Sequence, residues 1–184
     1  LGERDQLLKG IQTVGNMVSE KSLLPILSNV VIETTADGIQ LLATDLKTSI
    51  SHKMTIDVLQ QGAVTLPAKK LADIISELPD GKIELMVEEG YKAMIFSGKT
   101  RFQIMGFSKE DFPKLPAIQS GDRLTLTSQA LKQGIHAVVF AAAQDDTRFV
   151  LNGCLITVSP KEIRLVSTDG HRLSWATVPA TSTA

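Results

Sequence analysis

The stretch of sequence that decides the fold runs from residue 151 to residue 173 and reads Leu-Asn-Gly-Cys-Leu-Ile-Thr-Val-Ser-Pro-Lys-Glu-Ile-Arg-Leu-Val-Ser-Thr-Asp-Gly-His-Arg-Leu. It has a copy 124 residues upstream, since that shift places several of its residues on identical ones. The matches are Leu151 with Leu27, Ile156 with Ile32, Ile163 with Ile39, Leu165 with Leu41, and Thr168-Asp169 with Thr44-Asp45. Both copies alternate apolar and polar residues around a turn, which predicts paired strands. A fixed spacing indicates a chain built from duplicated β-rich modules.

Composition limits the classes of protein that are possible. The chain has 184 residues, of which 43% are hydrophobic and 21% charged, as is usual for one or two globular domains. No apolar run approaches the ~20 residues of a membrane-spanning helix, and residues 1–5 lack the order of a signal peptide. We therefore expect a cytoplasmic protein.

Net charge and cysteine content further limit the classes of protein that are possible. The net charge of −1 means that any contact with nucleic acid must use a local surface. Cys154 is the single cysteine, so it cannot form an internal disulfide, and its apolar neighbours predict a small buried side chain.

Periodicity predicts three successive β-α-β-β-β repeats of about sixty residues, which give an α+β fold. We call them repeat one (residues 1–62), repeat two (63–108) and repeat three (123–184). Asp5 is the expected cap of the first helix and Ser128 that of the third, whose Leu131, Ile135, Val138, Val139 and Ala142 should face inward. The expected helices cover 5–14, 69–78 and a segment after residue 128, and the expected strands cover 26–33, 39–44, 48–58, 63–67, 82–87, 92–97, 101–105, 123–127, 149–158, 163–168 and 172–178.

The segment 109–122 has no period and carries two prolines and a glycine, so it is typical of an interdomain linker. We expect repeats one and two to form domain one over residues 1–117, a linker at 118–122, and an incomplete second domain at 123–184. Repeat three would lack the companion that covers its helix and extends its sheet. It should therefore expose an apolar face and an unpaired strand edge, and should self-associate or be poorly ordered.

Seven motifs, in order along essentially the whole chain, resemble the bacterial sliding clamp, the β subunit of the replicative DNA polymerase III. They are Glu3-Arg4-Asp5, Leu7-Leu8-Lys9, Leu24-Pro25-Ile26-Leu27-Ser28-Asn29, Leu66-Pro67-Ala68-Lys69-Lys70, Asp111-Phe112-Pro113, Arg148-Phe149-Val150-Leu151-Asn152-Gly153 and Thr168-Asp169-Gly170-His171-Arg172-Leu173. The resemblance implies the DNA clamp fold, with this chain as its first domain and the first half of its second. The pattern departs where Leu1-Gly2 stand in place of a first strand with a starting Met, and where the sequence stops at Ala184.

The resemblance also implies a function and partners. A ring homodimer of such chains would encircle duplex DNA without regard to sequence, and would tether the polymerase without catalysis or a cofactor. Polymerase and clamp-loader subunits would bind it through short linear peptides. A stand-alone α+β peptide-binding adaptor that does not encircle DNA is the alternative, and a small-molecule enzyme is a third.

Two sets of site residues follow from the family. The expected DNA-binding residues are Lys21, Lys69, Lys70 and Phe149, while Val150 replaces a second aromatic residue seen in some members. Independently of the family, Lys9, Lys69, Lys70 and Lys132 fall on predicted helices outside the apolar stripe, where a curved assembly could gather them on its concave face. Ordinary solvated helix surface is the other interpretation.

The expected peptide pocket is apolar, and its first half matches Leu151, Thr168, Gly170, His171, Arg172 and Leu173. Gly170 would leave room for an inserted side chain, and Arg172 could bind an acidic group or carbonyl of the peptide. The alternative is that Leu151 and Leu173 are core residues.

Enzymatic signatures are weak. Ser97-Gly98-Lys99-Thr100 resembles the end of a phosphate-binding loop, but Ala93 replaces the first glycine and no helix follows. Asp169-Gly170-His171 lacks further metal ligands at suitable spacing, and Asp-Gly is common in hairpin turns. We therefore expect no catalytic and no metal-binding residues.

Overall fold

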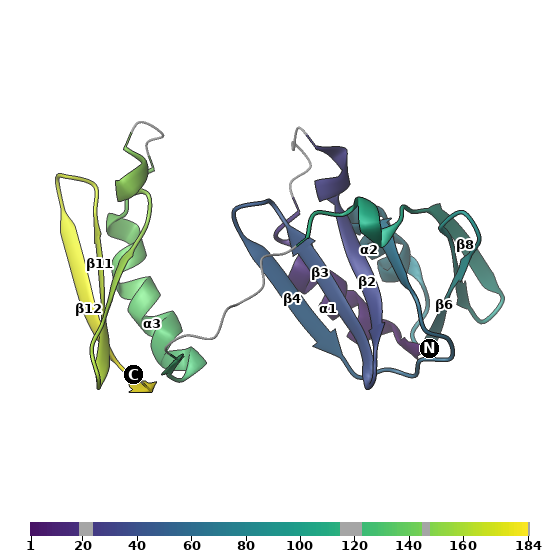
Figure 1. Cartoon of the computed structure of the whole chain (residues 1–184), viewed down its shortest axis with the longest axis horizontal. Coiled ribbons are helices and arrows are strands. Elements are labelled where there is room, and N and C mark those ends of the chain that lie inside the picture. Colours follow the sequence, from purple (N-terminus) through teal and green to yellow (C-terminus); the bar gives the residue numbers. More distant parts are fainter. Residues whose placement is uncertain (19–23, 115–122, 145–147, 184) are drawn as a thin grey trace. The chain divides into compact units, whose positions relative to one another are not determined.

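The computed structural model describes residues 1–18, 24–114, 123–144 and 148–183. The chain folds into two compact units, Leu1–Ala117 and Ile118–Ala184. We call them the N-terminal unit and the C-terminal unit and describe each by itself. Both combine helices with antiparallel sheets (Figure 1), so the α+β prediction is confirmed.

The N-terminal unit contains two four-stranded sheets with the orders β4-β3-β2-β5 and β1-β6-β7-β8. The two repeats exchange their first strands, because β1 of repeat one pairs with β6 and β5 of repeat two pairs with β2. This exchange makes one domain from two repeats. Its elements are β1 (Gly2–Glu3), α1 (Arg4–Gly15), η1 (Pro25–Ser28), β2 (Asn29–Thr35), β3 (Gly38–Thr44), β4 (Ser49–Met54), β5 (Ala63–Pro67), α2 (Ala68–Glu77), β6 (Lys82–Glu88), β7 (Lys92–Ser97), β8 (Thr100–Met105) and η2 (Lys109–Asp111).

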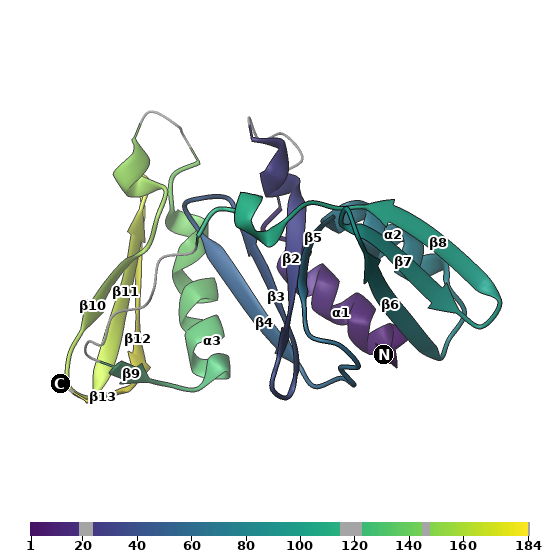
Figure 2. The ribbon, with the colours of Figure 1, turned by 45° about the vertical axis from the view of Figure 1, so that its right-hand side comes forward.

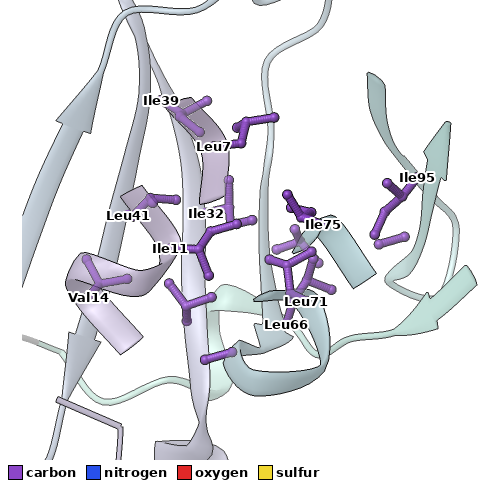
Figure 3. Packing of buried hydrophobic residues seen from close by; sticks show 14 of the residues in the cluster. Leu7, Ile11, Val14, Ile32, Ile39, Leu41, Leu66, Leu71, Ile75 and Ile95 are labelled. Atoms are coloured by element: carbon purple, nitrogen blue, oxygen red, sulfur yellow. The ribbon is translucent and has the colours of Figure 1, made fainter. Parts of the chain in front are cut away.

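One hydrophobic core joins both sheets to the helices α1 and α2, which pack against each other. Figure 3 shows Ile11 of α1, Ile32 of β2 and Ile75 of α2 within this core. Each is almost fully buried, and burial of such a side chain stabilises the fold by about 1.5–3 kcal/mol. The opposite faces of both helices remain in solvent, as the amphipathic sequence predicts.

The C-terminal unit is a single repeat, in which α3 packs on β11 and β12 (Figure 2). Its three-stranded sheet has the order β10-β11-β12, and a two-stranded sheet pairs β13 with β9. Its elements are β9 (Arg123–Thr125), α3 (Ser128–Val138), η3 (Val139–Ala141), η4 (Phe149–Leu151), β10 (Leu155–Val158), β11 (Glu162–Thr168), β12 (Leu173–Pro179) and β13 (Thr181–Thr183).

Repeats one and three match at the level of strand register. Leu155 pairs with Val166 as Val31 pairs with Leu42, at the 124-residue spacing. Helix approach also matches: a Cβ on Gly134 would lie 2.4 Å from Val178, and one on Gly10 would lie 2.4 Å from Met54. Gly10 and Gly134 are 124 residues apart, as are Met54 and Val178. A glycine therefore lets each helix come close to its sheet at the equivalent position.

Two of the predicted strands start later than expected, and the two starts lie at equivalent positions of repeats one and three. The strands predicted at 26–33 and 149–158 each begin with a 3₁₀ turn, η1 or η4, before β2 or β10 starts. Pro25 favours this turn in repeat one because it fixes φ, and the Asn29 amide donates hydrogen bonds to the carbonyls of Pro25 and Ile26. The alternating pattern does not distinguish a short 3₁₀ turn from a strand end. The predicted strand 48–58 is also shorter, as β4 ends at Met54.

Both predicted helix caps were wrong by one or two residues. Glu3 precedes α1 and makes no side-chain cap, while Asp5 lies within the first turn. For α3 the cap is Thr127, whose hydroxyl accepts a hydrogen bond from the Ala130 N–H at 3.2 Å, and Ser128 is the first helical residue.

The predicted linker begins too early. Lys109 forms an ion pair with Glu33 of β2, the Ser108 carbonyl accepts a bond from the Thr65 hydroxyl at 3.2 Å, and Phe112 is buried. This segment therefore belongs to the N-terminal unit. The remaining linker residues, 118–122, lie outside the described residues.

Repeat three exposes apolar side chains, as expected. Every residue of β10 is exposed, and β11 is its only partner among the described strands. On α3 the predicted inward face is partly wrong, since Ile135 and Val139 are exposed. Val138 is buried and Leu131 packs against the small core, as predicted. Gly134, which was not predicted, also faces the sheet, where its bare backbone comes close to Val178 and Leu165. Cys154 is half-buried against this small core.

Candidate functional site

The turn between β11 and β12 holds five of the six predicted peptide-pocket residues. The Thr168 hydroxyl donates to the Arg172 carbonyl at 2.7 Å and accepts from the Gly170 N–H at 3.1 Å. Asp169 Oδ1 accepts from the N–H groups of His171 and Arg172, both at 2.9 Å. Side chains thus fix the turn from both sides, and its backbone is arranged before any ligand binds.

The Asp169 carboxylate is the electrostatic centre of the turn. The N–H groups of Arg172 and His171 and then the Arg172 side chain lower its pKa to about 2. Arg172 Nε lies 2.9 Å from Asp169 Oδ2. The guanidinium is therefore held at its Nε edge, and its other N–H donors can reach a ligand.

Gly170 is required by the backbone, because its φ of 88° lies in the left-handed region. A Cβ at this position would lie 3.0 Å from Arg148 Nη1. Arg148 of the segment before η4 therefore reaches the turn. The Arg148 guanidinium therefore lies where a side chain of residue 170 would begin.

Phe140 forms an apolar wall beside the turn, with its ring centroid 5.8 Å from Arg172 Cζ. The Leu151 carbonyl accepts a bond from the Ala143 N–H at 2.9 Å, which ties η4 to the end of η3. Leu151 is half-buried, whereas Leu173 is 63% exposed and is not a core residue. Three segments thus meet around a turn with an exposed leucine.

The predicted DNA-binding lysines lie on a different surface. Lys69 and Lys70 occupy the first turn of α2, both exposed, and line a groove between α1 and α2 together with Ile11, Gly15 and Pro67. The N-terminal end of a helix carries positive partial charge, which adds to that of the lysines.

The other predicted DNA contacts belong to other parts of the chain. Phe149 is 78% exposed but lies in the C-terminal unit. Lys21 lies outside the described residues. Lys9 and Lys132 are exposed on α1 and α3, off the buried stripe.

The described residues include no group of three or more His, Cys, Asp or Glu side chains that could hold a metal ion. Gly98 and Lys99 form the tight turn between β7 and β8, where Ser97 pairs with Thr100. Across the described ranges no helix is long and apolar enough to span a membrane.

Sequence reasoning missed Phe140 and Arg148 as neighbours of the turn. Both precede the repeated stretch, and the segments that carry them meet the turn only in the folded unit. Phe140 follows the last turn of α3, where the helical pattern assigned no role to it.

The fold and the site together define a class of protein. Its members are built from similar β-α-β-β-β repeats, carry lysines on exposed helix faces, and have a partly apolar turn whose backbone is fixed by its own side chains. Residues 2–116 match the family model of the DNA polymerase III beta subunit, N-terminal domain, and residues 125–184 match that of its central domain. The chain belongs to the bacterial sliding clamp family, the DNA polymerase III β subunits.

Individual relatives agree with this assignment. The beta sliding clamp of Synechocystis sp. is 38% identical over 184 residues, which cover 96% of this chain and 47% of the relative. The sliding clamp of Bartonella birtlesii bound to griselimycin has a TM-score of 0.86 at 37% identity, covering 96% of this chain and 48% of that one. A Pseudomonas aeruginosa clamp, also bound to griselimycin, has a TM-score of 0.89 at 34% identity, with coverages of 97% and 48%. The chain thus spans about half the length of these relatives.

Proposed function

We propose that this chain is the part of a sliding clamp that contributes to a ring around duplex DNA and to tethering of the replicative polymerase. In this proposal it acts in the cytoplasm as a non-catalytic processivity factor without a cofactor. Residues 1–117 serve as clamp domain one, 118–122 as a linker and 123–184 as the first half of domain two. The ring closes as a homodimer of full-length chains.

The DNA-facing surface in this proposal carries Lys69, Lys70, Lys21 and Phe149. Its support is the groove between α1 and α2, where two adjacent lysines lie at the positive end of a helix. Such a surface offers charge to phosphates and no array of base-reading side chains. Binding should therefore be independent of base sequence.

The tethering site carries Leu151, Thr168, Gly170, His171, Arg172 and Leu173, and receives a short peptide of the polymerase or clamp loader. The observation that carries this assignment is the turn itself: it is fixed internally by Thr168 and Asp169 yet exposes Leu173 and part of Arg172. An apolar peptide side chain could contact the exposed Leu173 beside this turn. Arg172 could bond a peptide carbonyl or carboxylate.

DNA binding can be tested with labelled duplexes of two unrelated sequences over a series of salt concentrations. Because the chain spans about half the length of its clamp relatives, we expect it to bind weakly by itself, with a Kd of ~10⁻⁴ M or weaker at physiological salt and an affinity that falls steeply as salt rises. Combined substitutions Lys69→Glu and Lys70→Glu should abolish the binding. The matched control combines Lys82→Glu and Lys99→Glu, exposed lysines of β6 and the β7–β8 turn, and should retain most of it. Sequence-selective binding in high salt, or an equal loss in the control, would refute the DNA assignment.

A further inference from the structure

The outer face of β11 and β12 carries an aromatic and cationic patch next to the candidate peptide turn. The register pairs Thr168 with Leu173 and Val166 with Trp175 on one face, while Leu165 and Val178 are buried on the other. Trp175 is 62% exposed, and Arg164 Cζ lies 5.7 Å from the centroid of its ring. We call Arg164, Leu173 and Trp175 the Trp175 patch.

Repeat one shows what this face looks like when it serves only the fold. At the 124-residue spacing, Gln40 stands for Arg164 and Ser51 for Trp175, and the Gln40 amide donates to the Ser51 hydroxyl at 2.7 Å. Ser49, which is exposed, stands for Leu173. The two equivalent positions therefore form a neutral hydrogen bond in repeat one, whereas in repeat three the Arg164 guanidinium stacks on the exposed Trp175 indole.

Repeat one folds with Ser51 and Ser49 at these two positions, so the fold does not require an exposed tryptophan and leucine there. Tryptophan and arginine are, however, the residues that most often dominate the energy of protein interfaces. Tryptophan offers a large rigid apolar area and loses little side-chain entropy on binding. The difference between the repeats therefore indicates recognition.

Charge identifies the partner's chemistry. Arg164 makes no ion pair with any described residue, although Glu162 lies two residues away on the same face of β11. Arg172 contributes a second guanidinium near the turn, partly engaged by Asp169. A ligand on this face therefore meets one unpaired cation on an apolar surface, which favours an acidic residue next to an apolar one.

Leu173 belongs both to the candidate turn and to the patch, so the two surfaces are continuous. We propose that the Trp175 patch binds residues flanking the peptide anchor, an acidic residue on Arg164 and an apolar residue on Trp175. This inference rests on the proposed peptide-binding function of residues 168–173. It adds a determinant of which peptides are preferred.

Trp175 is the single tryptophan of the chain, so its fluorescence reports on the patch alone. Three peptides serve as probes. The first is a core of Gln, Leu and Phe, the second carries Asp-Leu at both ends of this core, and the third carries Lys-Leu at both ends. Amide NMR shifts of residues 168–173 measure binding at the turn in the same titrations. The acidic extension should tighten binding by about three- to tenfold and shift the Trp175 emission to shorter wavelength, whereas the lysine extension, which keeps only the apolar contact with Trp175, should give a smaller gain in affinity.

Two variants separate the contributions. Trp175→Ser, which introduces the residue of repeat one, should remove the gain from the leucine of the extension, and Arg164→Gln should remove the preference for Asp over Lys. The control Thr177→Ser, on the same face of β12, should leave both unchanged. In each variant the core peptide should still shift residues 168–173.

Each failure has a distinct reading. If the core peptide shifts residues 168–173 but the Asp-Leu extension gives no gain, the inference is overturned and the peptide turn stands. If no peptide shifts these residues, the proposed tethering site fails and the inference with it. A Trp175 emission that depends on protein concentration without peptide would show that a second copy covers the patch, which also overturns the inference.

Discussion

The β3–β4 turn of repeat one and the β11–β12 turn of repeat three use the same hydrogen bonds for different ends. Thr44 and Asp45 hold the first turn as Thr168 and Asp169 hold the second, with Leu46 N–H donating to the Thr44 hydroxyl at 3.0 Å. Leu46 has a φ of 73° where Gly170 has 88°. The Thr-Asp pair therefore builds the turn in either repeat, and the residue after it decides whether a leucine or a glycine stands at the positive φ.

The largest expected effect comes from introducing a side chain at position 170 of the β11–β12 turn. Gly170→Val places a β-branched side chain at positive φ and near Arg148, which should destabilise the C-terminal unit by about 2 kcal/mol. It should also remove peptide binding, whereas Lys69→Glu should leave it intact. The matched change Leu46→Gly relieves left-handed strain but adds unfolded-state entropy, so its effect should stay within about 0.5 kcal/mol of zero. Urea unfolding, followed by amide signals of each unit, measures both free energies. A loss as small for Gly170→Val as for Leu46→Gly would show that the β11–β12 turn tolerates a side chain at positive φ.

Alanine substitutions at the two glycines where a helix approaches its sheet should change stability by different amounts in repeats one and three. In Gly134→Ala the new methyl meets the stiff Val178 and Leu165, so overpacking should exceed the gain in helix propensity and cost about 1–2 kcal/mol. In Gly10→Ala the nearest atom is the flexible Met54 thioether, and the net change should stay within about 1 kcal/mol. The same unfolding experiment tests this pair. A larger loss for Gly10→Ala would contradict the claim that Met54 yields more easily than Val178.

A buried hydroxyl distinguishes the two cores. Ser167 on β11 is 2% exposed and its Oγ has no hydrogen-bond partner among the described residues, while the equivalent residue of repeat one is the buried Ala43. An unsatisfied buried hydroxyl is destabilising, so Ser167→Ala should stabilise the C-terminal unit by about 1 kcal/mol. Ala43→Ser, the reverse change, should destabilise the N-terminal unit. Loss of stability in Ser167→Ala would mean that the hydroxyl has a partner in solution.

The smallest effect concerns acid. Backbone N–H groups lower the pKa of Asp45 and, more strongly, that of Asp169, to about 2 from the usual 3.8. A carboxyl whose folded pKa is depressed stabilises the fold above its unfolded pKa, and this stabilisation is lost as pH falls from about 4 to about 2. Asp169→Asn should therefore flatten the pH dependence of the C-terminal unit in that window, and Asp45→Asn that of the N-terminal unit by less. Unchanged slopes in both variants would show that the turns do not respond to acid.

Much of this architecture could be predicted from the sequence, because alternation and helical spacing are physical requirements of half-buried elements. The 124-residue repeat located β3, β11 and both Thr-Asp turns. It could not show that η1 and η4 begin as 3₁₀ turns, since aliphatic runs fit either conformation. The exposure of Ile135 also depended on tertiary approach at Gly134, which no local pattern encodes.

The candidate site was only partly accessible from sequence. The motif at 168–173 marked the turn, but Phe140 and Arg148 join it through contacts made on folding. The pairing of Arg164 with Trp175 requires the strand register, which places them diagonally across β11 and β12.

The most direct test of the account is an NMR titration of the chain with a short peptide that carries a Gln followed by a Leu and Phe pair. We predict amide shifts clustered on residues 151–153 and 168–173, with millimolar affinity, on the order of 4 kcal/mol, and their loss in Gly170→Val. Shifts confined to the N-terminal unit, or none at millimolar peptide, would contradict the account and leave the turn a structural feature alone.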